Sequence, residues 1–255
     1  MNKPDLSIII PSIRVLNLEA LPLYIDNSIG PYSYEIIVVS PYSIPEQFLK
    51  KDNVKTIKDM GSPGRCVQIG SQLVEGKYLC WMSDDCTYLA PNGLAQCISI
   101  LEEKTEKDII SIRYFEGNGP GEFDLNYWTA WTHDSLRMPF VQKHWKCAPL
   151  GMYNTKYFRW FGGLDCRYEH INMNTHDLAF RAQNNGSEVI LSPQTVARFF
   201  WSWHNDESIP VREAWFENDK NLFATCWSQD QSNRIQIDYM NWNSAESKWS
   251  RRFGT

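Results

Sequence analysis

The first half of the sequence alternates between short apolar runs of strand length and segments of helix length. Leu6 to Ile10 and Glu35 to Val39 are β-branched runs bounded by proline or serine, which is typical of strands buried on both faces of a parallel sheet. Val54 to Ile57 and Tyr78 to Met82 are predicted as further strands, and Arg65 to Glu75 as a helix closed by a glycine. Because parallel strands need a crossover that is usually helical, this order predicts a Rossmann-like α/β fold with a mostly parallel central sheet flanked by helices.

Weaker signals of the same kind continue toward the C-terminus. Helices are predicted at Leu94 to Lys104 and at Thr175 to Asn184. Strands are predicted at Ile109 to Tyr114, Val189 to Leu191 and Thr195 to Trp201. The segment from Glu116 to Asn126 is rich in glycine, proline, asparagine and acidic residues, which is typical of a loop. We therefore predict one domain over residues 1–255, made of two halves at 1–115 and 116–255.

Charge, hydropathy and cysteine usage exclude several classes of protein. A net charge of −5 with mixed signs offers no basic surface for a nucleic-acid backbone, so nucleic-acid binding is not expected. The apolar run before Pro11 is too short for a signal peptide or a membrane span, and no later run reaches spanning length. Seven cysteines without a CxxC pair favour reduced thiols. We expect a cytoplasmic protein, and leave peripheral membrane attachment and assembly into an oligomer open.

The strongest local signal is the acid pair Asp84-Asp85, which follows Ser83 directly after a predicted strand. Strands of an open α/β sheet bind ligands at their carboxyl ends, so these carboxylates lie where a ligand is expected. One or two carboxylates together with substrate phosphates commonly hold Mg²⁺ or Mn²⁺. The alternative is a solvated turn in which one acid caps the next helix.

Two arginines stand near the predicted ends of strands. Arg14 comes just after Ser12, and Arg65 begins a helix after the loop from Gly61 to Gly64. The planar guanidinium group suits phosphate oxygens or base carbonyls, and the start of a helix offers backbone N–H groups to an anion. The alternative for Arg65 is a solvated helix residue.

The order of these motifs resembles the family-2 glycosyltransferases, which share the A-type glycosyltransferase fold. Leu6 to Ser12, Glu35 to Ser40, Gly64 to Gly76 and Tyr78 to Asp85 stand where that family has its two first strands, its Arg-bearing helix and the strand leading into its acidic motif. In the second half, Gly162-Gly163-Leu164-Asp165, followed by Asp177-Leu178 and Arg181, is similar to the family's GG-x-D motif and acid-x-D-L-x-x-R helix.

The resemblance implies an inverting glycosyltransferase that moves a sugar from a nucleoside-diphosphate sugar, most simply a UDP-sugar, to a hydroxyl of a glycan or similar acceptor. The half at 1–115 would bind the donor, and the half at 116–255 would bind the acceptor and supply the base. The residues expected to hold the nucleotide-sugar are Pro11, Ser12, Arg14, Ser40, Asp59, Arg65 and Asp84. The expected Mn²⁺ or Mg²⁺ ligands are Asp85 and His204.

Three departures from the family pattern bear on these roles. The second strand ends at Ser40-Pro41 instead of in aspartates, so recognition of the base is expected to shift to Ser40 or Asp59. Cys86 replaces the third acid of the acidic run, which leaves Asp85 as the main metal ligand. Thr175 stands where relatives carry the catalytic aspartate.

The general base is therefore sought among neighbouring acids. Asp177 and Glu169 are the first candidates, and Asp165 is a third. The alternative for Asp177 is an acid near the start of a helix that only stabilises the helix dipole.

Two other functions stay open. A nucleotidyltransferase would keep the fold, but it usually needs a glycine-rich loop after the first strand, and Pro11 to Val15 has no glycine. A non-catalytic sugar-binding protein would use the many aromatic side chains of the second half, and Thr175 in place of an acid favours it.

Overall fold

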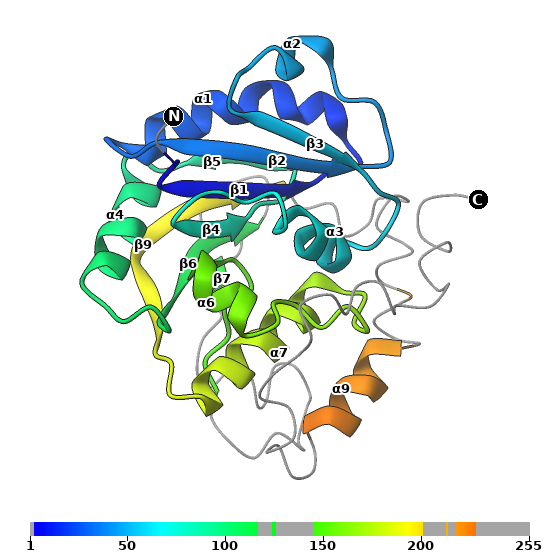
Figure 1. Cartoon of the computed structure of the whole chain (residues 1–255), viewed down its shortest axis with the longest axis vertical. Coiled ribbons are helices and arrows are strands. Elements are labelled where there is room, and N and C mark those ends of the chain that lie inside the picture. Colours follow the sequence, from blue (N-terminus) through cyan, green and yellow to red (C-terminus); the bar gives the residue numbers. More distant parts are fainter. Residues whose placement is uncertain (1–2, 117–123, 126–144, 201–212, 214–217, 228–255) are drawn as a thin grey trace.

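A nine-stranded sheet forms the centre of the protein in the computed structural model, which describes residues 3–116, 124–125, 145–200, 213 and 218–227 (Figure 1). The strand order is β3-β2-β1-β4-β8-β6-β9-β5, and β7 pairs with β6. The strands are β1 (Leu6–Pro11), β2 (Tyr34–Ser40), β3 (Val54–Lys58), β4 (Tyr78–Trp81), β5 (Cys86–Leu89), β6 (Ile109–Glu116), β7 (Asp124–Leu125), β8 (Gly151–Asn154) and β9 (Val189–Phe199).

Most of the strands share one direction. β1 is parallel to β2 and β4, and β2 is parallel to β3. β8 is antiparallel to both β4 and β6, and β6 is parallel to β9, so β6 and β9 run the same way as β4. The predicted α/β fold with a mostly parallel sheet is confirmed. Because β4 pairs with β8, the two predicted halves share one sheet, and the boundary between them stays a prediction.

Helices flank the sheet. They are the 3-10 helix η1 (Val15–Ala20) and the helices α1 (Leu21–Ile29), α2 (Glu46–Leu49), α3 (Pro63–Gly70), α4 (Gly93–Glu102), α6 (Thr155–Trp160), α7 (Ile171–Asn184) and α9 (Lys220–Trp227). α1 packs on α4, and α3 packs on β1, β2 and α7. Among the described residues, no helix combines the length and the apolar composition that crossing a bilayer requires.

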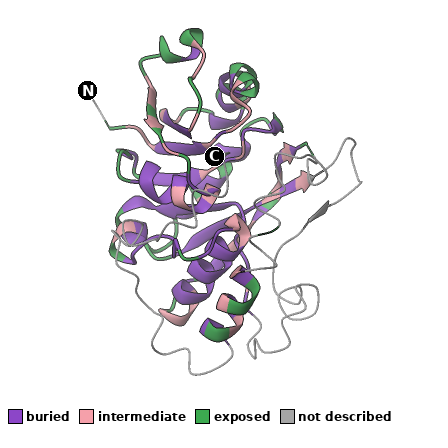
Figure 2. Cartoon of the chain, turned by 90° about the vertical axis from the view of Figure 1, so that its right-hand side faces the viewer, coloured by how far each residue is buried: buried purple, intermediate pink, exposed green. Residues whose placement is uncertain are grey.

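β1 and β2 are apolar and buried on both faces because helices cover both faces of the sheet there, and Figure 2 shows buried residues along its centre. Gly70 shows how closely α3 approaches the sheet, since a Cβ atom there would lie 2.6 Å from Cγ2 of Ile9 and 3.2 Å from Cγ2 of Val39. Side chains alternate between the faces of a strand, so Ile8 and Ile10 face the opposite layer. Both are fully buried.

Several predicted boundaries differ from the structure. α3 ends at Gly70 and not at Glu75, because the chain turns away and Nη2 of Arg159 donates to the carbonyls of Ser71 and Val74. This guanidinium comes from α6, far along the chain, so no local sequence pattern indicates where α3 ends.

The other differences lie in the second half. α7 begins at Ile171, four residues before the predicted start, because the Asp219 carboxylate accepts the N–H groups that precede the helix. The two predicted strands around Pro193 are one strand, β9, with a shift of register where it passes β6. β5 was not predicted, and it forms by pairing with β9.

The Glu35 carboxylate ties three parallel strands together near their amino ends. It lies 2.5 Å from Oγ of Ser7 in β1, 2.6 Å from the backbone N of Glu75 and 2.7 Å from Nζ of Lys55 in β3. Burial alone would raise the pKa of Glu35, but these hydrogen bonds outweigh burial and hold the pKa below its ordinary value.

We predict that Glu35→Gln lowers the free energy of unfolding near neutral pH by about 1–3 kcal/mol, because it weakens a buried, charge-assisted network. A lowered folded-state pKa adds stability above the unfolded-state pKa of about 4.3, and that stability is lost as the pH falls through the folded-state pKa. The difference between variant and wild type should therefore shrink below about pH 4 in urea titrations. Glu103→Gln, at an exposed helix end, is the matched control, and equal effects of both variants at all pH values would contradict the role of Glu35.

Candidate active site

The loops that follow β1 and β4 emerge side by side at the carboxyl edge of the sheet. Ile9 of β1 pairs with Trp81 of β4, so residues 12–14 and 83–85 leave the sheet together. This pairing brings the acid pair to the first loop of the fold, as expected for a ligand site in an open α/β sheet.

Asp84 holds the loop after β1 in place. Its Oδ2 accepts from Oγ of Ser12 at 3.1 Å and from the backbone N atoms of Ile13 and Arg14 at 3.0 and 2.8 Å. Its Oδ1 accepts from Nε of Arg14 at 2.9 Å and from Nη2 at 2.5 Å. A carboxylate with this many donors is held in one orientation. The expectation that Asp84 helps to hold the nucleotide-sugar stays a prediction.

Asp85 has a different environment. Its Oδ2 lies 3.4 Å from Nη1 of Arg14, whereas its Oδ1 has no hydrogen-bond partner among the described residues. The residue is only 8% exposed, and burial raises the pKa of Asp85, with the Arg14 guanidinium opposing that rise. A buried carboxylate oxygen without a partner is costly, so Asp85 is suited to a ligand that arrives from outside, such as a hydroxyl or a cation.

Asp85 opens into a pocket of about 600 Å³ between η1, the start of α1, β5 and the end of β9. The pocket is lined by Arg14, Leu16, Asn17, Glu19, Ala20, Tyr24, Asp84, Asp85, Cys86, Thr87 and Phe200. This volume is within the usual range for small-molecule sites. The acids and the aromatic side chains give it the composition of a site for a polar ligand with apolar faces.

Asp59 and Arg65 form a second polar cluster, after β3. Nε and Nη2 of Arg65 lie 3.1 Å from Oδ1 and Oδ2 of Asp59, and Oδ1 also accepts the N–H of Gly61. Ser62 caps α3 by accepting the N–H of Arg65. Ser40 lies beside them, since its carbonyl accepts the N–H of Asp59. The structure thus brings the candidate residues after β2 and β3 together.

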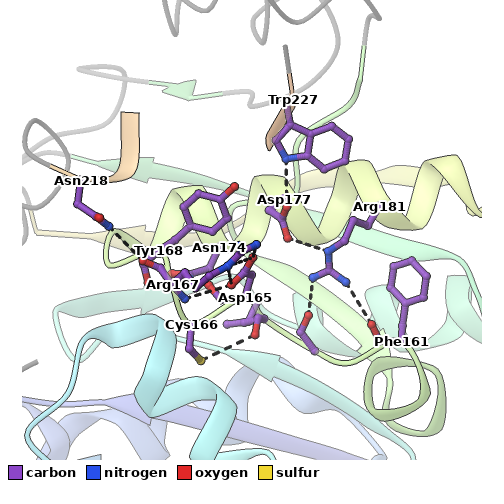
Figure 3. Close-up of polar contacts among 12 residues, drawn as sticks. Phe161, Asp165, Cys166, Arg167, Tyr168, Asn174, Asp177, Arg181, Asn218 and Trp227 are labelled. Carbon is purple, nitrogen blue, oxygen red and sulfur yellow. Dashed lines mark hydrogen bonds and ion pairs between the residues drawn. The ribbon is translucent and has the colours of Figure 1, made fainter. Parts of the chain in front are cut away.

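Asp177 lies inside the protein, in the second turn of α7 (Figure 3). Its Oδ2 accepts from Nε of Arg181 at 2.7 Å, and its Oδ1 accepts from Nε1 of Trp227 at 3.0 Å. The two Nη atoms of Arg181 donate to the carbonyls of Phe161 and Gly163. Burial raises the pKa of Asp177, and Arg181 opposes that rise. Because α7 begins at Ile171, Asp177 lies beyond the first turn, so it is not the acid at the helix start that the alternative role requires.

The other two candidate acids of this region, Asp165 and Glu169, are buried as well. Asp165 accepts from Nε of Arg167 at 2.9 Å and from Nη2 at 2.5 Å (Figure 3). Glu169 is 4% exposed, and its backbone N–H donates to both oxygens of Asp219. Burial raises the pKa of Asp219 to about 7. No sequence pattern singles out Asp219, because it lies in the tail without a recognisable motif.

Thr175, where the sequence resemblance leads one to expect a catalytic aspartate, is buried within α7. Its hydroxyl lies 3.1 Å from the carbonyl oxygens of Ile171 and Asn172, to which it donates. His204 lies outside the described residues. In the described part of the chain, no three His, Cys, Asp or Glu side chains are grouped so that they could hold a metal ion.

Comparison with known proteins identifies the fold and not a family. No protein-family model and no curated protein matches the sequence. Among solved structures, GalNAc-T7 with UDP, GalNAc and Mn²⁺ superposes with a TM-score of 0.58 at 14% identity, over 95% of this chain and 56% of that one. S. aureus TarS 1-349 in complex with UDP-GlcNAc gives a TM-score of 0.55 at 15% identity, over 96% and 74%.

A longer S. aureus TarS structure gives a TM-score of 0.52 at 14% identity, and the chain spans only 40% of its length. At these identities, the similarity shows a shared architecture. The chain has the mixed, mostly parallel α/β sheet flanked by helices that is found in A-type glycosyltransferase structures.

Proposed function

We propose that the protein is an inverting glycosyltransferase that moves a sugar from a UDP-sugar to a hydroxyl of a glycan or similar acceptor. The observation that carries the proposal is Asp85, which lines a pocket at the shared carboxyl edge of β1 and β4 and has one buried oxygen without a hydrogen-bond partner among the described residues. Structures of the same fold hold UDP with Mn²⁺ in GalNAc-T7 and UDP-GlcNAc in TarS, which supports a nucleotide-sugar as the ligand.

The nucleotide would lie along the loops after β1, β2 and β3. Pro11 and Ser12 end the first strand, and Ser40 ends the second. The paired side chains of Asp59 and Arg65 place a hydrogen-bond acceptor and a hydrogen-bond donor beside Ser40. Such groups suit the carbonyl and N–H edge of a pyrimidine base.

Asp85 would hold Mn²⁺ or Mg²⁺ together with His204 and the donor diphosphate. One carboxylate with an unpartnered oxygen suits such a cation, because these ions keep several ligands from substrate phosphates and water. When bound, the cation would neutralise charge on the departing diphosphate. Arg14 lies beside Asp85 and supplies a fixed positive charge to the same region.

The transfer itself needs one proton acceptor. The acceptor hydroxyl gives its proton to a carboxylate, its oxygen bonds to the anomeric carbon, and the bond from that carbon to the diphosphate breaks with its electron pair leaving on the diphosphate. Displacement in line inverts the anomeric centre. Asp177 and Glu169 are the first candidates for this base. Asp177 has both oxygens bonded inside the protein, so we assign it a structural role. Glu169 stays a candidate.

A sugar-binding protein without catalysis is the second candidate. The internal hydrogen bonds of Thr175 and Asp177 favour it, because neither side chain is turned toward a ligand. Release of UDP from a UDP-sugar by the purified protein would separate an enzyme from a binding protein.

We predict that UDP binding requires Mn²⁺ or Mg²⁺ and that Asp85→Asn removes most of this requirement. Loss of one charge-assisted contact should cost about 1.5–3 kcal/mol of binding free energy in the presence of the cation. Calorimetric titration of UDP with Mn²⁺ or with EDTA measures both quantities. Asp52→Asn, which removes an exposed acid before β3 at the opposite edge of the sheet, is the matched control. UDP affinity in the wild type that EDTA leaves unchanged would contradict the prediction.

We further predict that Asp177→Asn lowers the free energy of unfolding by about 3–5 kcal/mol, because it leaves the Arg181 guanidinium as an uncompensated buried charge. Denaturant unfolding measures the loss. The double variant Asp177→Asn with Arg181→Met should recover part of it, since the unpaired cation is then absent. A stable Asp177→Asn protein that has lost turnover but not UDP affinity would return Asp177 to the role of base.

A further inference from the structure

The pocket at Asp85 contains a carboxylate that belongs to none of the motifs considered so far. Glu19 lies on η1, is exposed, and lines the pocket together with Asp85. Nε2 of Gln47, on α2, donates a hydrogen bond to Oε1 of Glu19. This contact fixes one oxygen of the carboxylate from the side of α2.

The other pocket acids are committed elsewhere. Within the described part of the chain, both oxygens of Asp84 accept hydrogen bonds from Ser12, Ile13 and Arg14. Asp85 has its Oδ1 buried and Oδ2 beside Arg14, which is the position for a cation and the diphosphate. Among the described residues that line the pocket, Glu19 is then the carboxylate left to receive a proton.

The acids near α7 do not line this pocket. Asp177 is enclosed by Arg181 and Trp227, and Glu169 is buried beside Asp219. Thr175 stands where the sequence resemblance leads one to expect an acid, and its hydroxyl bonds within the helix. A base on η1 would supply the role expected of α7.

The pocket also has surfaces that suit a sugar ring. Phe200 is 45% exposed and Tyr24 is partly exposed, and both line the pocket. Sugar rings pack their C–H faces against aromatic faces while their hydroxyls bind carboxylates and amides, here from Glu19 and Asn17.

From this arrangement we infer that Glu19 is the general base of the transfer. The inference rests on the proposed function. The acceptor hydroxyl, or water in hydrolysis, loses its proton to the Glu19 carboxylate while its oxygen bonds to the anomeric carbon. The bond to the diphosphate breaks, and the diphosphate leaves with the electron pair. Gln47 is a positioning residue, because it acts through Glu19.

The test uses the full chain with Mn²⁺, a panel of UDP-hexoses that includes UDP-GlcNAc, and release of UDP as the readout. Glu19→Gln should lower turnover by about 10²–10⁴-fold and leave UDP affinity and the melting temperature unchanged. Glu19→Ala should regain turnover when sodium formate supplies a carboxylate in solution. Glu46→Gln removes an exposed acid from the neighbouring α2 and should change nothing, since Glu46 does not line the pocket.

Four results would overturn the inference. The first is wild-type turnover in Glu19→Gln, and the second is loss of turnover in Glu169→Gln while Glu19→Gln stays active. A wild-type protein that binds UDP but releases none from any donor would leave the base without a reaction. If the wild type binds no UDP with Mn²⁺ present, the proposed function fails first, and the inference fails with it.

Discussion

The Asp84 carboxylate is the contact on which the candidate site depends. It follows β4, yet it accepts hydrogen bonds from a side chain and two backbone N–H groups of the loop after β1, and from the Arg14 guanidinium. Arg14 and Asp84 are 70 residues apart in the sequence. Because a buried carboxylate needs such donors, the loop cannot move away without leaving a charge unpaired. Arg14 and Asp85 are held beside the pocket as a result.

A second polar network, away from the pocket at Asp85, holds α7, α9 and the Gly162-Gly163 turn together. Arg181 is fully buried, and it joins Asp177 to the carbonyls of the Gly162-Gly163 turn. Trp227 of α9 donates to the same carboxylate, so the network also holds α9 against α7. The D-L-x-x-R pattern on α7 is therefore explained by packing. A carboxylate that acts as general base is therefore sought among those that line a pocket.

The sheet explains why residues from both halves of the chain meet. β8 lies between β4 and β6 and runs opposite to both, so a strand of the second half is inserted between two strands of the first. β9 continues to Phe199, and Phe200 then reaches the pocket beside Asp85. β5 pairs with β9 directly after the acid pair, which fixes one wall of the pocket. The pairing of β5 with β9 joins segments more than 100 residues apart.

The sequence by itself determined the α/β class, the first four strands and the acid pair at a strand end, because apolar runs of strand length between helical segments have few other solutions. It also located the loops that carry Arg14 and Arg65. The tertiary structure alone decided the insertion of β8, the pairing of Asp59 with Arg65, the enclosure of Asp177 and the place of Glu19 in the pocket. These features depend on contacts between residues distant along the chain, and no local periodicity or spacing records which distant side chain will complete a buried charge or line a cavity.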